Sequence, residues 1–125
     1  MTIEEFKELR EKYFNDISKI IEMAKSTNVM DSKEILEKAT KEVMGQFCVY
    51  WEKMKDAEDD GTLDKNLVNI CIFYRLLSRR LSNALDSLIY ISEKYFDKNM
   101  FIEDLEDAMK TCKDGYIENL KMRRE

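Results

Sequence analysis

The sequence contains no histidine, and this absence narrows the chemistry that the protein can perform. Histidine is the commonest side-chain ligand of transition metals and a frequent general base in enzymes. Catalytic arrangements that pair Ser or Cys with His are therefore excluded, and so are di-iron sites that need a Glu-x-x-His motif on two helices. We expect no catalytic residue, no cofactor and no metal site, and we interpret the chain as a non-enzymatic protein.

Proline is also absent, and glycine occurs only three times in 125 residues. Long helices are compatible with this composition, because these two residues weaken a helix interior more than any others. The few glycines do not form a phosphate-binding loop motif. Charged residues make up 38% of the chain, against about 25% in an average domain, which is typical of helices with charged outer faces. We predict a single helical domain over residues 1–125.

Cysteines and long apolar stretches are scarce as well. Cys48, Cys71 and Cys112 are an odd number without a CxxC motif, so we interpret them as reduced thiols in the core of a cytoplasmic protein. The N-terminal residues are acidic where a signal peptide would be apolar. The longest apolar run covers residues 70–74 and is too short to span a bilayer. We therefore expect no membrane partner.

The net charge of the chain is −5 and its isoelectric point is about 5.0. Dedicated nucleic-acid-binding domains usually have the opposite balance, because their affinity depends on neutralising phosphates. The overall charge thus argues against nucleic acid as the main partner. It leaves protein partners, including a second copy of the chain, as the expected class.

Four segments show apolar residues at steps of three and four, the period of an amphipathic helix. Thr2 with Glu5 and Asp31 with Glu34 have the spacing of a capping box for the first two helices, and Thr62 is placed to cap the third. The apolar stripes are Phe6, Leu9, Tyr13, Ile17, Ile20 and Ala24; Leu36, Ala39, Val43, Phe47, Tyr50 and Met54; Leu63, Leu67, Ile70, Tyr74, Leu77, Leu81, Ala84, Leu88, Ile91 and Tyr95; and Ile102, Leu105, Met109, Cys112, Tyr116 and Leu120.

The connections between these segments are short, which makes consecutive helices antiparallel neighbours. We predict an all-α, up-down-up-down antiparallel four-helix bundle with long helices of roughly 25–30 residues. The third stripe alternates steps of four and three and therefore forms a heptad seam. Gly45 lies in the middle of the second helix, which we attribute to close packing at that point. Gly115 is expected to bend the fourth helix or to end it early.

A basic segment interrupts this acidic chain, because no Asp or Glu occurs between Asp64 and Asp86. It carries Arg75, Arg79 and Arg80, which fall at heptad positions b, f and g if the seam is labelled a and d. These positions lie outside the core of a coiled-coil-like bundle.

Apolar residues share that outer side of the third helix. Val68, Ile72 and Leu76 fall at b, f and c, and Phe73 falls at g. A bundle helix with one buried face should have a polar back, whereas the first half of this helix is apolar nearly all round. Its outer side therefore needs a cover, from a partner or from the chain itself.

Three interpretations of this segment remain open. In the first, the outer side is a partner interface, since interface cores favour aromatic residues, Met and Arg, and the protein acts as a homodimer or as a small subunit or inhibitor of a larger complex. The predicted interface comprises Val68, Ile72, Phe73, Arg75, Leu76, Arg79 and Arg80. In the second, the helix is buried within the chain and the arginines pair with acids: Arg79 and Arg80 with Asp114 and Glu118, or Arg80 with Glu42. In the third, Arg75, Arg79 and Arg80 make a weak contact with nucleic acid.

Two carboxylate patterns suggest other functions. Asp56-x-Glu58-x-Asp60-Gly61 resembles the first half of an EF-hand calcium loop, but Leu67 stands where that loop has its bidentate Glu, and we predict an acidic turn. Separately, Glu34 with Glu37 and Asn83 with Asp86 resemble the paired helical carboxylates of all-α nucleoside-triphosphate pyrophosphohydrolases. A Mg²⁺-dependent nucleotide hydrolase is therefore the alternative function, although Asn83 replaces one Glu of that pattern.

Overall fold

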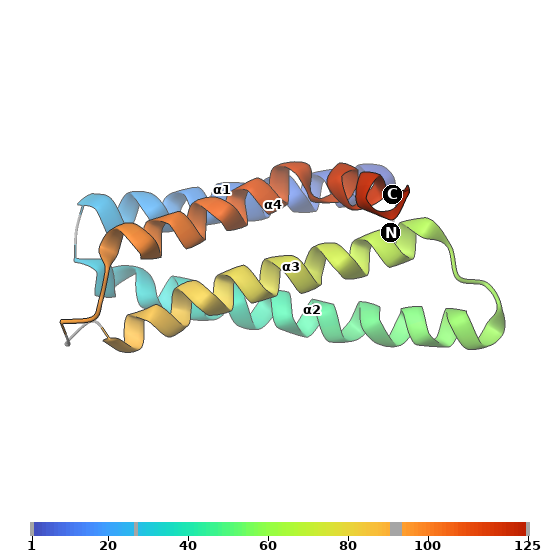
Figure 1. Cartoon of the computed structure of the whole chain (residues 1–125), viewed down its shortest axis with the longest axis horizontal. Helices are drawn as coiled ribbons and strands as arrows, with labels where there is room; N and C mark the ends of the chain where they lie inside the picture. The colour runs from blue at the N-terminus through green and yellow to red at the C-terminus, as the bar shows by residue number, and fades with distance from the viewer. Residues whose placement is uncertain (1, 27, 91–93, 125) are drawn as a thin grey trace.

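The computed structural model describes residues 2–26, 28–90 and 94–124, without the side chains of residues 3, 90 and 114–124. Its helices are α1 (Ile3–Ser26), α2 (Lys33–Asp60), α3 (Lys65–Ser87) and α4 (Lys98–Arg124), with short 3-10 turns at Val29–Ser32 and Leu88–Tyr90. The described residues contain no strand. The predicted all-α four-helix bundle with antiparallel consecutive helices is confirmed (Figure 1).

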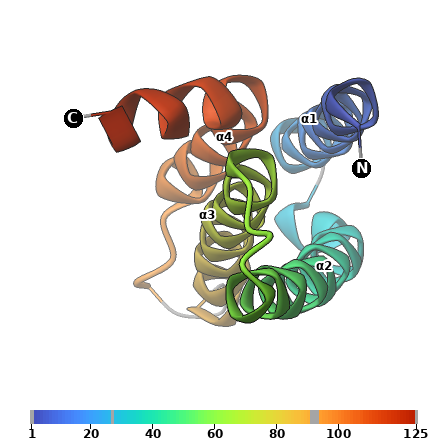
Figure 2. The same ribbon diagram turned by 90° about the vertical axis from the view of Figure 1, so that its right-hand side faces the viewer.

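The four helices form two layers, one with α1 and α4 and the other with α2 and α3 (Figure 1). In the end-on view α3 occupies the central position, next to both α2 and α4 (Figure 2). Among the pairs of helices that follow one another in the sequence, α1 and α2 contact each other least. The bundle is therefore tight around α3 and open along the seam between α1 and α2.

Helix starts are fixed by side chains that accept hydrogen bonds from free backbone N–H groups. The predicted cap of α1 is confirmed, since the Thr2 hydroxyl accepts from the Glu5 amide at 3.1 Å. The other two predictions are wrong. Asn28, which accepts from the Met30 amide, starts a 3-10 turn that leads into α2. Asp64 caps α3 by accepting from the Leu67 amide at 2.8 Å.

The three glycines have different environments in the structure. Gly61 ends α2 in the left-handed conformation, with φ of 73°, which side chains disfavour. Gly45 is exposed, and a Cβ placed there would meet nothing within 4 Å, so the predicted close packing is wrong. α4 continues past Gly115 to Arg124, and its last turns lead away from α1 (Figure 2).

The heptad seam of α3 is shorter than its sequence pattern. It is buried from Ile70 to Leu88, but Leu63 lies before the helix and is exposed. Tyr95 lies beyond the helix and is 75% exposed, and Ile91 is outside the described residues. Along the described part of the chain, no helix combines the length and the apolar character that crossing a bilayer requires.

Aromatic side chains fill the centre of the bundle and join three helices. The rings of Phe6 in α1 and Phe73 in α3 meet edge-to-face, with their centroids 5.2 Å apart. Tyr74 stacks on Tyr50 of α2 at 5.4 Å and meets Tyr13 of α1 at 6.3 Å. Such aromatic pairs contribute about 0.5–1.5 kcal/mol beyond the area that they bury. They hold α1 and α2 to α3, although α1 and α2 hardly touch each other.

The cysteines are all free thiols, and two of the three lie where the sequence predicts them. Cys71 and Cys112 are buried, and burial raises the pKa of both, that of Cys112 to about 12. Cys48 is exposed on α2, so its predicted core position is wrong. The two buried thiols behave as small apolar side chains in the core.

The glycines of α2 provide a matched test of helix geometry. Replacing Gly45 with Ala should raise the free energy of unfolding by about 1 kcal/mol, because Ala favours a helix interior and has free space there. Replacing Gly61 with Ala should lower it by about 1–2 kcal/mol, because the left-handed conformation is strained for Ala. Urea denaturation of both variants measures the two shifts. Shifts of equal sign would contradict this account of the helix end.

Candidate functional site on the second and third helices

The structure separates the residues that the sequence grouped as one partner interface. Phe73 has 0% of its side chain exposed and packs against Phe6, so its predicted place on the surface is wrong. Val68 is also buried, at 7% exposure. The physical reason is the central position of α3, which has neighbours on more sides than a corner helix with a single buried face.

The other residues of that group lie at or near the surface. Arg75 and Arg79 are exposed, whereas Ile72 and Leu76 are partly buried. The apolar outer side of α3 is thus partly covered by the chain itself. Of the seven predicted interface residues, the two that stay exposed are Arg75 and Arg79. Their contact with a partner remains a prediction.

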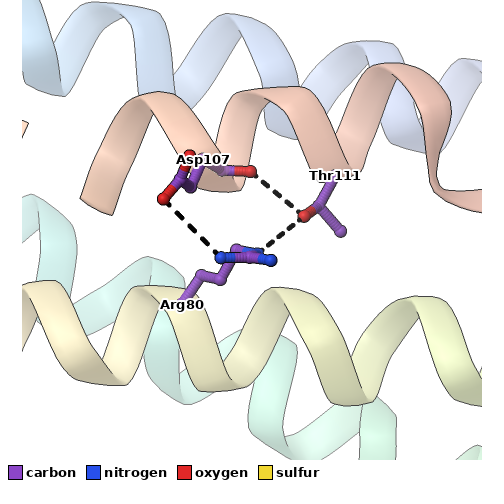
Figure 3. Close-up of polar contacts among 3 residues, drawn as sticks. All are labelled: Arg80, Asp107 and Thr111. Carbon is purple, nitrogen blue, oxygen red and sulfur yellow. Dashed lines mark hydrogen bonds and ion pairs between the residues drawn. The ribbon is translucent and has the colours of Figure 1, made fainter. Parts of the chain in front are cut away.

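Arg80 faces α4 and has partners within the chain (Figure 3). Its Nε donates to the Thr111 hydroxyl at 3.1 Å, and its Nη1 lies 3.7 Å from Oδ2 of Asp107. The Thr111 hydroxyl in turn donates to the backbone carbonyl of Asp107. The prediction that arginines of α3 pair with acids is therefore confirmed for Arg80, but with a partner that the sequence did not indicate.

The predicted partners of these arginines have other surroundings. Glu42 lies 3.5 Å from Lys12 of α1 and so joins α1 to α2. The side chains of Asp114 and Glu118 are outside the described residues. The partners of Arg80 on α4 lie one to two turns closer to the start of that helix than predicted. The prediction counted residues from the loop between α3 and α4, whose length the sequence does not define.

The guanidinium of Arg80 also acts on a nearby carboxyl group. The pKa of Asp104 is raised above its ordinary value, first by burial and then by the negative charge of Asp107, whereas Arg80 lowers it. An opposite charge close to a carboxylate favours the ionised form. The positive charge of Arg80 therefore offsets the repulsion between Asp104 and Asp107 at the α3–α4 contact.

An apolar stripe lies open on α2, beside α3. Met44 and Trp51 are 49% and 41% exposed, and Cys48 between them is exposed too. The steps of four and three place all three side chains on one side of the helix. Phe47 stands behind the stripe, with its ring centroid 6.0 Å from that of Trp51. The only tryptophan of the chain is thus at the surface within an apolar patch.

The stripe continues onto α3 through a contact between Ser82 and Met44. The Ser82 hydroxyl donates to Sδ of Met44 at 3.8 Å. Antiparallel helices rise equally per residue, so seven residues forward on α2 and seven back on α3 bring Trp51 level with Arg75. We name the α2–α3 surface as the set Met44, Cys48, Trp51, Arg75 and Arg79.

Part of this surface had a signal in the sequence. Met44 and Trp51 lie beside the apolar stripe of the second helix. With them, the helix has more apolar residues than one buried face can hold. The exposure of Cys48 had no such signal, because a lone cysteine is usually buried. Comparing the width of each apolar stripe with the single buried face of a bundle helix would have pointed to α2 as well as to α3.

The carboxylate patterns have local roles in the fold. Asp56, Glu58 and Asp60 belong to the last turns of α2, and Gly61 caps that helix, so an EF-hand loop does not form there. Glu37 pairs with Lys33 on its own helix. Across the described residues, no group of three or more acidic or cysteine side chains is placed to hold a metal ion.

Three tyrosines, Tyr13, Tyr50 and Tyr74, place phenol groups in the core, but they offer little chemistry. Burial raises the pKa of Tyr13 to about 12, with a further contribution from the charge of Glu42. Burial also raises the pKa values of Tyr50 and Tyr74. These phenols therefore stay protonated at neutral pH and act as packed rings.

Comparisons of the chain with protein-family models, with curated proteins and with solved structures found no match. The function is therefore argued from the surfaces and charges of this chain alone.

The buried position of Phe73 can be tested against the exposed position of Arg79. Phe73→Ala should lower the free energy of unfolding by about 3–5 kcal/mol, because it leaves a cavity in the aromatic centre. Arg79→Ala should change it by no more than about 0.5 kcal/mol, as is usual at exposed positions. Chemical denaturation measures both variants. A small loss of unfolding free energy for Phe73→Ala would contradict the buried position of this residue.

The influence of Arg80 on α4 predicts a change in the pKa of Asp104. Arg80→Gln should raise that pKa further, because the charge that lowers it is removed. Folding raises this pKa, so the stability that Asp104 contributes is present at low pH and is lost as the pH rises through the folded-state value. Titration of the carboxyl group by NMR measures the shift in both proteins. An unchanged pKa would show that Arg80 does not act on Asp104.

Proposed function

We propose that this protein is a non-enzymatic helical bundle that acts through protein–protein contacts, and that the α2–α3 surface makes the contact. The observation that carries the proposal is the exposure of the single tryptophan next to Met44, level with Arg75 on the neighbouring helix. The partner is a second copy of the chain or a component of a larger assembly.

The residue types of the α2–α3 surface support a contact role. Trp, Met and Arg are enriched in the cores of protein interfaces, and Trp and Arg are the commonest hot-spot residues. A tryptophan side chain removes a large apolar area from water when a partner covers it. The planar guanidinium groups of Arg75 and Arg79 can pair with carboxylates or stack on aromatic rings of a partner.

The two alternative functions have weaker support. Contact with nucleic acid relies on a basic segment, and the pairing of Arg80 with Asp107 leaves two exposed arginines in it. For the nucleotide hydrolase, Asn83 and Asp86 are exposed on α3, and Glu34 lies in the first turn of α2, where an acid is favoured by the helix dipole. A cytoplasmic location forms part of our proposal. It is supported by the three free thiols, because reducing compartments keep cysteines unpaired.

Trp51 provides both the test and its own fluorescent reporter. If the partner is a second copy, sedimentation at increasing concentration should show association, together with a shift of the tryptophan emission to shorter wavelength. Trp51→Ala should weaken that association by at least tenfold, because a hot-spot tryptophan contributes about 2 kcal/mol or more. If the partner is another protein, one component of an extract of the source organism should be retained by the wild type and lost with Trp51→Ala.

Ile35→Ala is the matched control, because Ile35 is exposed to a similar degree, 43%, on another side of α2. It should retain the association and the captured component. A protein that is monomeric at all concentrations and captures nothing in a Trp51-dependent manner would overturn the proposal. Equal losses for Trp51→Ala and Ile35→Ala would overturn the choice of the α2–α3 surface.

A further inference from the structure

The opposite layer of the bundle contains a cavity of about 290 Å³ between α1 and α4. It is lined by Lys7, Arg10, Glu11 and Phe14 of α1 and by Cys112 and Lys113 of α4. The volume is close to the lower limit of typical small-molecule sites. This is the volume that about ten water molecules occupy in the liquid. A ligand of about ten heavy atoms or fewer therefore fits.

Positive charge gathers around this cavity, although the chain as a whole is acidic. Among the described residues that line it, Lys7, Arg10 and Lys113 carry positive charge and Glu11 is the one acid. The ion pairs between described residues are Lys12–Glu42, Lys33–Glu37 and Arg80–Asp107, and none of them neutralises a cation of the cavity. Charges of one sign that line a concave, partly desolvated site concentrate the field and attract the opposite charge.

Arg10 is held in place by the fold. Its Nη1 donates to the backbone carbonyl of Lys113 at 3.3 Å, and its guanidinium carbon lies over the Phe6 ring, 5.2 Å from the centroid. Both contacts position the guanidinium without cancelling its charge, since a carbonyl and a ring are neutral. A fixed cation of this kind loses little conformational entropy when it binds an anion.

The remaining lining is apolar. Phe14 is partly buried and packs against the core, and Cys112 is 2% exposed. Burial keeps the Cys112 thiol protonated at neutral pH, even though Arg10 acts in the opposite direction. The thiol therefore carries no negative charge that would balance the cations around the cavity. The cavity combines cations with an apolar wall, which suits a ligand that has both an anionic group and a hydrocarbon part.

We propose that the cavity between α1 and α4 binds a small organic carboxylate with a short hydrocarbon chain. The carboxylate contacts Arg10 and one or both lysines, and the chain lies against Phe14. Guanidinium groups match carboxylates in charge and in planar shape. This site lies in the layer opposite the α2–α3 surface and does not depend on the contact function proposed for that surface.

Hexanoate is a suitable probe, and a titration followed by amide NMR tests the proposal. It should bind saturably and shift the amide signals of Glu11, Phe14 and Lys113. Hexan-1-ol should bind about tenfold more weakly, because it lacks the charge, and so should inorganic phosphate, because it lacks the chain. Arg10→Gln should weaken hexanoate binding by at least tenfold, the effect of removing a charged hydrogen-bond partner.

Lys41→Gln is the matched control, because it removes the same charge from an exposed position on α2 and should leave the affinity unchanged. Lys7→Gln, at an exposed lysine of the cavity, should weaken binding about threefold; it decides the matter if Arg10→Gln does not fold. Equal binding of hexanoate and hexan-1-ol, or equal effects of Lys7→Gln and Lys41→Gln, would overturn the proposal.

Discussion

Packing of α3 against all three other helices is the constraint on which the rest of the structure depends. Phe73 meets Phe6 of α1, Tyr74 stacks on Tyr50 of α2, and Arg80 contacts α4. A helix in this position must be apolar on more than one side, because each neighbour removes a different face from water. The uninterrupted apolar run at residues 70–74 is the sequence consequence of that position.

The central position of α3 also decides which surfaces stay available. Once Val68 and Phe73 are used inside the bundle, the apolar side chains that remain open near α3 come mainly from α2, through Met44 and Trp51. The arginines divide in the same way, since Arg80 turns to α4 while Arg75 stays exposed. The open seam between α1 and α2 is a further result, because α1 packs mainly on α4 and α2 packs mainly on α3.

The sequence predicted the helices well, since a period of three and four residues repeats along each of them. The cap at Thr2 was predictable because a capping box is a local motif. The caps at Asn28 and Asp64 were not, because several polar residues compete within each turn and the loop geometry selects one of them. Burial of Phe73 could not be predicted either, since heptad positions assume one seam per helix, and α3 has more than one.

The candidate site shows a similar division. The involvement of Arg75 and Arg79 follows from a charge pattern that is visible in the sequence. The pairing of Arg80 with Asp107 needs the register of α3 against α4, which depends on the connection between them. Asn69 is fully buried, and neither atom of its side-chain amide has a hydrogen-bond partner among the described residues. The apolar residues around it in the sequence are compatible with burial. Burial of an amide without a partner could not be predicted, because a buried polar group of this kind is normally paired.

The contact between Arg10 and Lys113 brings together residues that are 103 positions apart, whereas Met44 and Ser82 in the α2–α3 hairpin are 38 positions apart. The entropy lost on closing a flexible loop grows only with the logarithm of its length. Joining α1 to α4 across nearly the whole chain therefore costs only about 1 kcal/mol more than closing the hairpin. A helix from one extreme of the chain can thus complete the bundle at almost the same entropic cost as a helix next in sequence.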